Sequence, residues 1–246
     1  MNRSIKRRHG RCRHTNTKRN LKKQRGGDIA QIENIIIDSM ANLNIRTTQR
    51  TIVTQNSRGI YAVDFACSKF RIDYNQMVLH IAHLTKCGQL SGTNILKCII
   101  TIGELLHMNS ITLYDVSTIN KGSDCEYSLC RYYILLTGES WYNSFGFVSD
   151  DHDKNKLFNK SIRNMKLNDF VTNGRHYNYI IGILKDERYD IYNLTVHDAI
   201  KYLTYVMKNK NASCRNDYSY VLIAIKHIVD ASEKQLYYNA FLQLKL

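Results

Sequence analysis

The first regular pattern of apolar positions along the chain begins just after Asp28. Apolar side chains recur there every three or four residues, at Ile29, Ile32, Ile36, Met40 and Leu43. This spacing predicts an amphipathic helix with Asp28 as its N-cap. From residue 51 the pattern changes to short runs typical of β-strands, which cover residues 51–55, 60–67, 70–74 and 77–85. The turn residues at 56–59, between the first two runs, predict a hairpin.

The strand expected at 77–85 begins an alternation of strands and helices. A glycine-containing loop follows it, and then come a helical pattern over residues 95–106, a strand at 110–117 and a helix at 125–136. Residues 138–147 predict a short helix that leads into another strand. Because parallel neighbouring strands need a crossover connection such as a helix, this order predicts a mixed α/β fold. We expect a mixed central sheet flanked by helices on both faces, spanning residues 28–165.

Beyond residue 148 the chain becomes polar and then helical. Residues 149–156 are rich in charge and predict a solvated loop, without the converging ligands that a metal site needs. Helical periodicity returns at residues 196–207 and 218–236, with Thr195 and Asp217 as possible N-caps. We therefore expect residues 166–246 to form a helical extension.

Positive charge is concentrated at the start of the chain. The 246 residues carry 35 Lys and Arg against 21 Asp and Glu, a formal net charge of +14. Eleven of the basic residues lie in the first 25 positions, so the rest of the chain has a net charge of only +3. Residues 1–27 therefore predict a disordered basic tail. Such a tail suits contact with nucleic acid, nuclear import or an anionic membrane surface, or it serves only to keep the chain in solution.

Other sequence features exclude several classes of protein. No stretch approaches 18 uninterrupted apolar residues, so we expect no transmembrane segment. The N-terminus has no apolar run after its charges, which argues against a secretory signal. The seven cysteines include no Cys-x-x-Cys pair and no zinc-ligand spacing. We expect reduced, mostly buried thiols in an intracellular protein, and no bound metal.

The segment from residue 77 to residue 147 carries the pattern that bears on function. A strand runs into Gln89-Leu-Ser-Gly92, and the backbone N–H groups that open the next helix can hold a phosphate. Ile-Thr-Leu-Tyr-Asp-Val at 111–116 forms the next strand, and Tyr142-Asn-Ser-Phe-Gly-Phe147 closes the segment. This order resembles the core of the GNAT superfamily of acyl-CoA-dependent N-acetyltransferases. With the basic, glycine-ended tail and the Asn- and Ile-rich composition, the chain resembles acetyltransferase-like proteins of giant DNA viruses.

The resemblance implies a function and the residues that would perform it. It implies an N-acyltransferase that moves an acetyl group from acetyl-CoA to an amine acceptor, a protein or a small molecule, by direct attack. The residues that it implies for CoA binding are Leu84, Gln89, Leu90, Ser91, Gly92, Thr93 and Asn94. Tyr142 matches the tyrosine that in many members protonates the leaving CoA thiolate.

The general base stays open among three residues. His83, His80 and Asp64 could each take the proton that the attacking amine loses, directly or through water. The two histidines are three residues apart on one strand and so face opposite sides, which means that at most one faces the cleft.

Two departures from the family's pattern keep other interpretations open. Asn94 stands where the family's loop has its last Gly or Ala, and the segment from Asn120 to Tyr142 is longer than the family's usual spacing. One alternative is a catalytically inactive GNAT-like viral or scaffold protein that binds nucleic acid through its basic tail. Another is a basic nucleic-acid-binding protein whose core only dimerises. If the chain is viral, its location would be the host cytoplasm, the nucleus or the virion.

Overall fold

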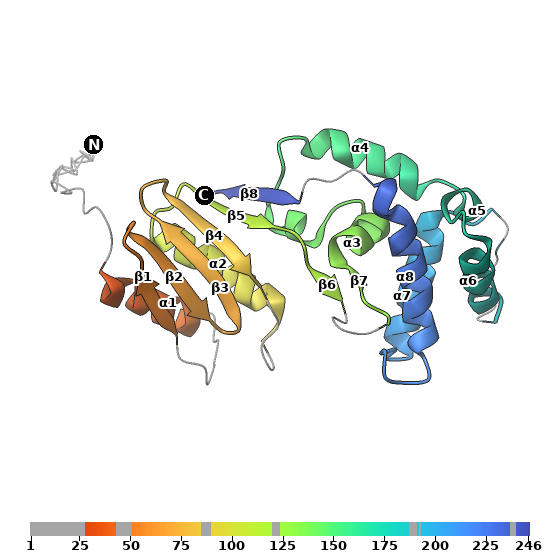
Figure 1. Cartoon of the computed structure of the whole chain (residues 1–246), viewed down its shortest axis with the longest axis horizontal. Helices are drawn as coiled ribbons and strands as arrows, with labels where there is room; N and C mark the ends of the chain where they lie inside the picture. The colour runs from red at the N-terminus through yellow and green to blue at the C-terminus, as the bar shows by residue number, and fades with distance from the viewer. Residues whose placement is uncertain are drawn as a thin grey trace, which may run out of the picture.

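The structure is a computed structural model that describes residues 28–42, 51–84, 90–119, 124–186, 191, 193–236 and 240–246. Its mixed α/β fold, which confirms the predicted fold class, has two parts that lie next to each other along the long axis (Figure 1). We call the six-stranded sheet with helices α1 and α2 the sheet unit, and helices α3 to α8 the helical unit. The predictions for the tail at 1–27 and for Leu43, Gln89 and Asn120 lie outside the described residues.

The sheet has the strand order β1-β2-β3-β4-β5-β8. Its strands are β1 Ile52–Gln55, β2 Ile60–Phe65, β3 Ser68–Asp73, β4 Val78–His83, β5 Ser110–Tyr114 and β8 Phe241–Lys245. Within this sheet β4 and β5 pair in parallel and the other neighbours pair antiparallel. The predicted hairpin joins β1 to β2. Asn56 Oδ1 accepts hydrogen bonds from the N–H groups of Arg58 and Ile60, and Gly59 has a φ of 75°.

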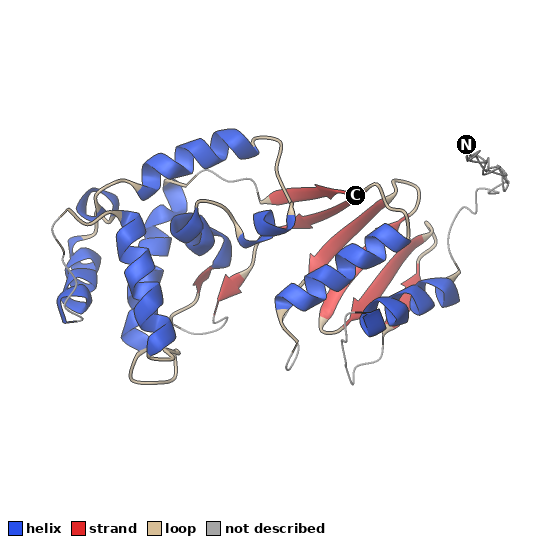
Figure 2. Cartoon of the chain, turned by 180° about the vertical axis from the view of Figure 1, so that it is seen from behind, coloured by secondary structure: helices blue, strands red, loops and turns tan. Residues whose placement is uncertain are grey.

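Two helices cover one face of the sheet. α1 (Ile29–Asn42) and α2 (Gly92–Leu105) both lie across this face (Figure 2). Side chains alternate accordingly, because Val63, Phe70 and Leu79 are buried while the residues beside them on each strand are partly or fully exposed. The opposite face of β1 to β4 carries no helix in the described part of the chain. The expectation of helices on both faces is therefore wrong here, as strands buried on both faces would be apolar throughout.

The helical unit follows β5 and closes around a core of its own. Its elements are β6 Thr118–Ile119, β7 Tyr127–Ser128, α3 Leu129–Thr137, α4 His152–Arg163, α5 Leu167–Phe170, α6 Gly174–Asp186, α7 Val196–Asn209, α8 Ser219–Ala231 and the 3₁₀ helix η2 Ser232–Lys234. The 3₁₀ helix η1, Trp141–Phe145, comes between α3 and α4 but packs against the core of the sheet unit. Phe170, Ile200 and Ile225 are fully buried in this core. The helices predicted at 196–207 and 218–236 are confirmed as α7 and as the shorter α8. Every helix in the described ranges is too short or too polar to span a bilayer.

Helix α4 contradicts the sequence prediction. The charged pattern at 149–156 predicts a loop, and this is wrong because a helix begins at His152. α4 turns Asn155, Asn159 and Ile162 toward the interior, while Leu157 is exposed. Since its buried face is mainly polar, the periodicity of apolar residues gives no sign of this helix.

The C-terminal residues return to the sheet unit. Phe241–Lys245 pairs antiparallel with β5, and Val148 and Gln243 exchange two backbone hydrogen bonds of 2.9 Å. The predicted helical extension therefore does not include these residues, and the prediction of helix up to residue 246 is wrong. Leu242, Leu244 and Leu246 alternate with Gln243 and Lys245, a strand pattern that the prediction of a helical extension overlooked.

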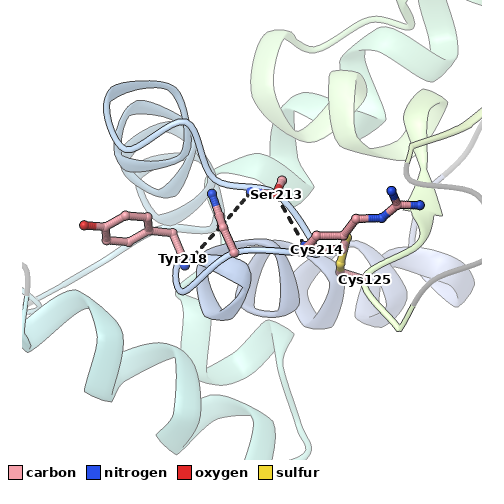
Figure 3. The surroundings of a disulfide bond; sticks show 6 residues. Cys125, Ser213, Cys214 and Tyr218 are labelled. Atoms are coloured by element: carbon pink, nitrogen blue, oxygen red, sulfur yellow. Dashed lines mark hydrogen bonds between the residues drawn. A yellow bond between two sulfur atoms is a disulfide. The ribbon is translucent and has the colours of Figure 1, made fainter.

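A disulfide bond crosses the helical unit. Cys125, just before β7, is bonded to Cys214 in the loop between α7 and α8 (Figure 3). Their Cα atoms are 6.0 Å apart although 89 residues separate them in sequence. The expectation of reduced thiols is therefore wrong for this pair. Cys98 and Cys130 are free and buried, as predicted for the cysteines in general.

Candidate functional site

A cavity of about 540 Å³ lies where the sheet unit meets the helical unit. Its walls come from β4, β5, β6, α2, α3 and η1 and from residues next to them. The lining residues are Ile81, Ala82, His83, Leu84, Gly92, Thr93, Leu113, Tyr114, Val116, Ser117, Thr118, Leu129, Tyr133, Trp141 and Tyr142. The volume and the mainly apolar and aromatic lining are typical of a small-molecule site.

The cavity begins where the parallel strands β4 and β5 cease to pair. Their last paired residues are Ile81 and Leu113, and beyond this pair both strands supply residues to the cavity wall. The pairing of β4 with β3 is also irregular at this point, because Lys69 is opposite His83 and Phe70 is opposite Ile81. Ala82 is thus an extra residue in β4, and a bulge of this kind bends a strand and frees backbone groups from the ladder. The parallel pair consequently opens into a wedge.

The N-terminus of α2 borders the same cavity. Gly92 and Thr93 line it, and Ser91 before them is the N-cap. The N–H of Asn94 is already used, because it donates to Ser91 Oγ at 3.2 Å. No acceptor in the described part of the chain is found for the N–H groups of Gly92 and Thr93. These two donors and the positive end of the helix dipole are therefore available to an anion.

The 3₁₀ helix η1 holds Tyr142 in the cavity wall. Gly146 ends η1 with a φ of 87°, a conformation that favours glycine, and Asn143 accepts a hydrogen bond from the N–H of Ser140 at 2.7 Å. The ring of Tyr142 packs edge-on against Trp141, with ring centroids 4.9 Å apart. A Cβ on Gly92 would lie 3.7 Å from Trp141 Cη2, so η1 also lies against the start of α2.

The hydroxyl of Tyr142 stays protonated in the cavity wall. The residue is only 5% exposed. Burial, with smaller contributions from Asp115 and Cys130, raises the pKa of its hydroxyl well above the ordinary value. The phenol therefore stays protonated near neutral pH, although the raised pKa also makes it a weaker acid than a free phenol.

The two histidines of β4 lie in different surroundings. His83 lines the cavity. His80 is outside the lining, on the open face of the sheet, with Nδ1 3.0 Å from Thr112 Oγ1. Burial lowers the pKa of His80 and the charge of Arg71 lowers it further, so that this ring is neutral at pH 7. Because Ala82 is an extra residue, His83 and His80 lie opposite Lys69 and Arg71, which share one face of β3. The prediction that the two histidines face opposite sides is therefore wrong, and of the two only His83 lines the cavity.

Asp64, the third candidate base, also lies away from the cavity. It is on β2 and forms an exposed ion pair with Lys69 at 3.6 Å. Among the three candidate bases, the structure thus brings only His83 to the cavity.

Only some of the predicted CoA-binding residues lie at the cavity. Leu84, Gly92 and Thr93 line the cavity. Ser91 and Asn94 are exposed at the start of α2, outside the lining, and Leu90 packs partly buried against the core of the sheet unit. Asn94, which departs from the family's pattern, is exposed and is not among the residues that line the cavity.

Several residues at the site were not predicted from the sequence. Tyr114, Tyr133 and Thr118 line the cavity. Asp115, which follows Tyr114, is 3% exposed; its Oδ1 accepts a hydrogen bond from Ser117 Oγ at 2.6 Å, and its Oδ2 has no partner within the described ranges. Burial raises the pKa of Asp115 although hydrogen bonds from neighbouring groups oppose the shift. In the sequence, the sign that Asp115 lies near a site was its position as a polar residue directly after the apolar strand at 110–114.

The cavity wall is almost free of formal charge. None of its lining residues is Asp, Glu, Lys or Arg, and His83 is the only histidine among them. Nowhere in the described ranges do three or more His, Cys, Asp or Glu side chains gather as ligands for a metal ion.

Comparisons with protein-family models, with curated proteins and with solved structures found no match for the chain. Functional inference therefore depends on the geometry of this cavity.

Proposed function

We propose that the protein is an N-acyltransferase that moves an acetyl group from acetyl-CoA to an amine. The observation that carries the proposal is the wedge between the parallel strands β4 and β5, with the N-terminus of α2 beside it. An acyl-CoA presents two features to such a site, an anionic pyrophosphate and an extended pantetheine arm that ends in a thioester. The site offers donors for the first and an unpaired strand edge for the second.

The start of α2 would bind the pyrophosphate. The N–H groups of Gly92 and Thr93 have no acceptor among the described residues, and a helix N-terminus favours negative charge. The pantetheine arm would lie along the end of β4, where the bulge at Ala82 takes backbone groups out of the ladder. Backbone donors at this position would also polarise the thioester carbonyl as negative charge develops on its oxygen.

The transfer itself needs two proton movements. The amine nitrogen attacks the carbonyl carbon, the tetrahedral intermediate collapses with cleavage of the carbon–sulfur bond, and the sulfur receives a proton. Tyr142 would supply this proton, because its hydroxyl is protonated and in the cavity wall. His83 would accept the proton that the nitrogen loses, directly or through water, and pass it to the tyrosinate or to solvent.

Calorimetric titration with acetyl-CoA tests the binding step. Thr93→Glu places a carboxylate at the first turn of α2, where it suits the helix dipole but repels a pyrophosphate. We expect acetyl-CoA affinity to fall by about tenfold or more in Thr93→Glu, while the matched neutral variant Thr93→Gln stays close to the wild type. No heat and no thermal shift at millimolar acetyl-CoA in the wild-type protein would contradict the proposal.

Release of free CoA thiol tests the chemical step. Tyr142→Phe should lower kcat about 100-fold and leave acetyl-CoA affinity nearly unchanged, because the hydroxyl acts on the leaving group. Unchanged acetyl transfer in this variant would show that Tyr142 is not the acid.

Nucleic acid is the partner that we propose for the basic tail. The support is the sequence alone, which places eleven Lys and Arg within residues 1–25. Deletion of residues 1–27 should abolish salt-sensitive binding to DNA, because neutralised phosphates release counterions. Persistence of the binding in the deletion variant would assign it to the rest of the chain. Location in a host cytoplasm, nucleus or virion remains part of this proposal.

A further inference from the structure

Three aromatic rings form a ledge on the open face of the sheet, next to the cavity. Tyr114 on β5 packs against Phe241 on β8, with centroids 5.3 Å apart, and against His80 on β4, with centroids 6.0 Å apart. Tyr114 is 60% exposed and Phe241 is 38% exposed. We call these three residues the aromatic ledge. Because Tyr114 also lines the cavity, the ledge continues directly into it.

Among the described residues, the lining of the cavity offers no carboxylate to a cation. None of the lining residues is acidic, and Asp115 is buried outside the lining with its pKa raised by burial. Arg71, opposite His80, adds positive charge beside the ledge.

This charge distribution disfavours a protonated alkylamine as acceptor. An ammonium group that enters the cavity loses its hydration and gains no counter-ion there. The faces of the aromatic ledge could attract a cation weakly, but at an exposed site this attraction is worth only about 0.5–1 kcal/mol. An amine that is neutral at pH 7 has no such cost.

We propose that the acceptor is a primary aromatic amine, whose ring stacks on the aromatic ledge while its amino group enters the cavity. This inference rests on the proposed function. The lone pair of an aromatic amine is delocalised into its ring, so the amine is neutral at pH 7 and attacks without prior loss of a proton. Its nitrogen forms a bond to the acetyl carbon, the bond from carbon to sulfur breaks, and one N–H proton is lost as CoA thiol takes up one proton. The products are the N-acetylated aromatic amine and free CoA.

Two isomeric amines test the acceptor class with the full-length protein. Para-toluidine and benzylamine have the same atoms and a similar shape, but only benzylamine is protonated at pH 7. We expect kcat/KM for para-toluidine to exceed that for benzylamine by about tenfold or more at pH 7. The rate with para-toluidine should also change little between pH 6 and pH 9, while the rate with benzylamine rises. Equal rates, or a preference for benzylamine at pH 7, would overturn the inference.

Substitution of the ledge tests where the ring binds. Tyr114→Ala should raise KM for para-toluidine by about tenfold, since stacking on an aromatic side chain is worth about 1–3 kcal/mol. Tyr205→Ala is the matched control, because Tyr205 on α7 is also 60% exposed and lies in the helical unit. An unchanged KM in Tyr114→Ala, or an equal rise in Tyr205→Ala, would contradict stacking on the ledge.

The outcomes separate this inference from the proposed function. If acetyl-CoA binds and benzylamine is acetylated faster than para-toluidine, the acceptor class is wrong and the transferase proposal stands. If acetyl-CoA does not bind, both fall together.

Discussion

The sheet unit and the helical unit differ in how completely their own helices and strands cover and pair with one another. In the helical unit, α3 to α8 surround one closed core, and the Cys125–Cys214 disulfide holds a loop against it. In the sheet unit, one face of β1 to β4 is left open and the parallel pair β4–β5 separates before its strands end. The aromatic ledge lies on the less complete unit, and the cavity lies where that unit meets the helical unit. In this chain a candidate site therefore arises where regular pairing stops.

The two units also share a boundary at this cavity. Leu129 and Tyr133 of α3 line it, and α3 otherwise contributes to the core of the helical unit. The helical unit thus supplies one wall of the site, while the sheet unit supplies the strands and the helix N-terminus. The stability of the cavity wall that α3 supplies depends on whether the two cores unfold together or separately.

Truncation of one buried phenylalanine in each core has the largest expected effect. Phe70 and Phe170 are both at most 1% exposed, in the sheet unit and the helical unit respectively. Phe70→Ala and Phe170→Ala should each lower the free energy of unfolding by about 3–5 kcal/mol, from lost burial and a residual cavity. Denaturant unfolding followed by residue-specific hydrogen exchange would measure which core opens first. Leu157→Ala, at a 72% exposed position, is the control and should stay within about 0.5 kcal/mol. Identical exchange in both cores of either variant would show that they form one cooperative unit.

Removal of the disulfide should affect mainly the helical unit. The double variant Cys125→Ser/Cys214→Ser frees a closed loop of about 90 residues in the unfolded chain. We expect a loss of about 2–4 kcal/mol in the stability of the helical unit, with little change in exchange from the sheet strands. Thermal unfolding with and without reductant provides the same comparison in the wild-type protein. A reductant-insensitive transition would contradict this prediction.

A smaller loss is expected from a buried hydrogen bond between α3 and α7. The hydroxyls of Tyr132 and Thr204 are 2.9 Å apart, and Thr204 also donates to the carbonyl of Ile200. Tyr132→Phe should lower the free energy of unfolding by about 1 kcal/mol, because Thr204 loses a buried partner. Chemical denaturation would detect this change, and the combined variant Tyr132→Phe/Thr204→Val should be less than additive. Strict additivity would mean that the two hydroxyls do not interact.

The smallest effect is a gain in stability that depends on pH. Burial raises the pKa of Asp115, so the folded state binds this proton more tightly than the unfolded state does. Stability is therefore lost as pH rises from the ordinary carboxyl pKa through the raised pKa of the folded state, and the penalty is complete above that value. Asp115→Asn should stabilise the protein at pH 7, and the gain should vanish in acid. Unfolding curves at several pH values would measure it, and an equal gain at every pH would exclude an effect of ionisation.

The sheet unit could be predicted from the sequence more completely than the helical unit. Strands β1 to β4 alternate between a buried and an exposed face, so their positions follow from local pattern. Helix α4 buries Asn155 and Asn159 and so leaves no apolar periodicity, whereas β8 has a short alternating pattern but its partner β5 is distant in sequence. At the site, the sequence motif and the strand pattern predicted Gly92, His83 and Tyr142. The positions of Tyr114 and Tyr133 beside them depend on tertiary packing.

The return of the C-terminal residues to the sheet has a mechanical consequence. Residues 149–240 leave the sheet unit at Val148 and re-enter it beside the same residue, through the two bonds to Gln243. Tension applied between Asp28 and Leu246 therefore loads the β5–β8 pairing first. The helices between Val148 and β8 carry no force until that pairing breaks. Stretching single molecules should then release the C-terminal strand in an early, small step and extend the helices in a later, longer one.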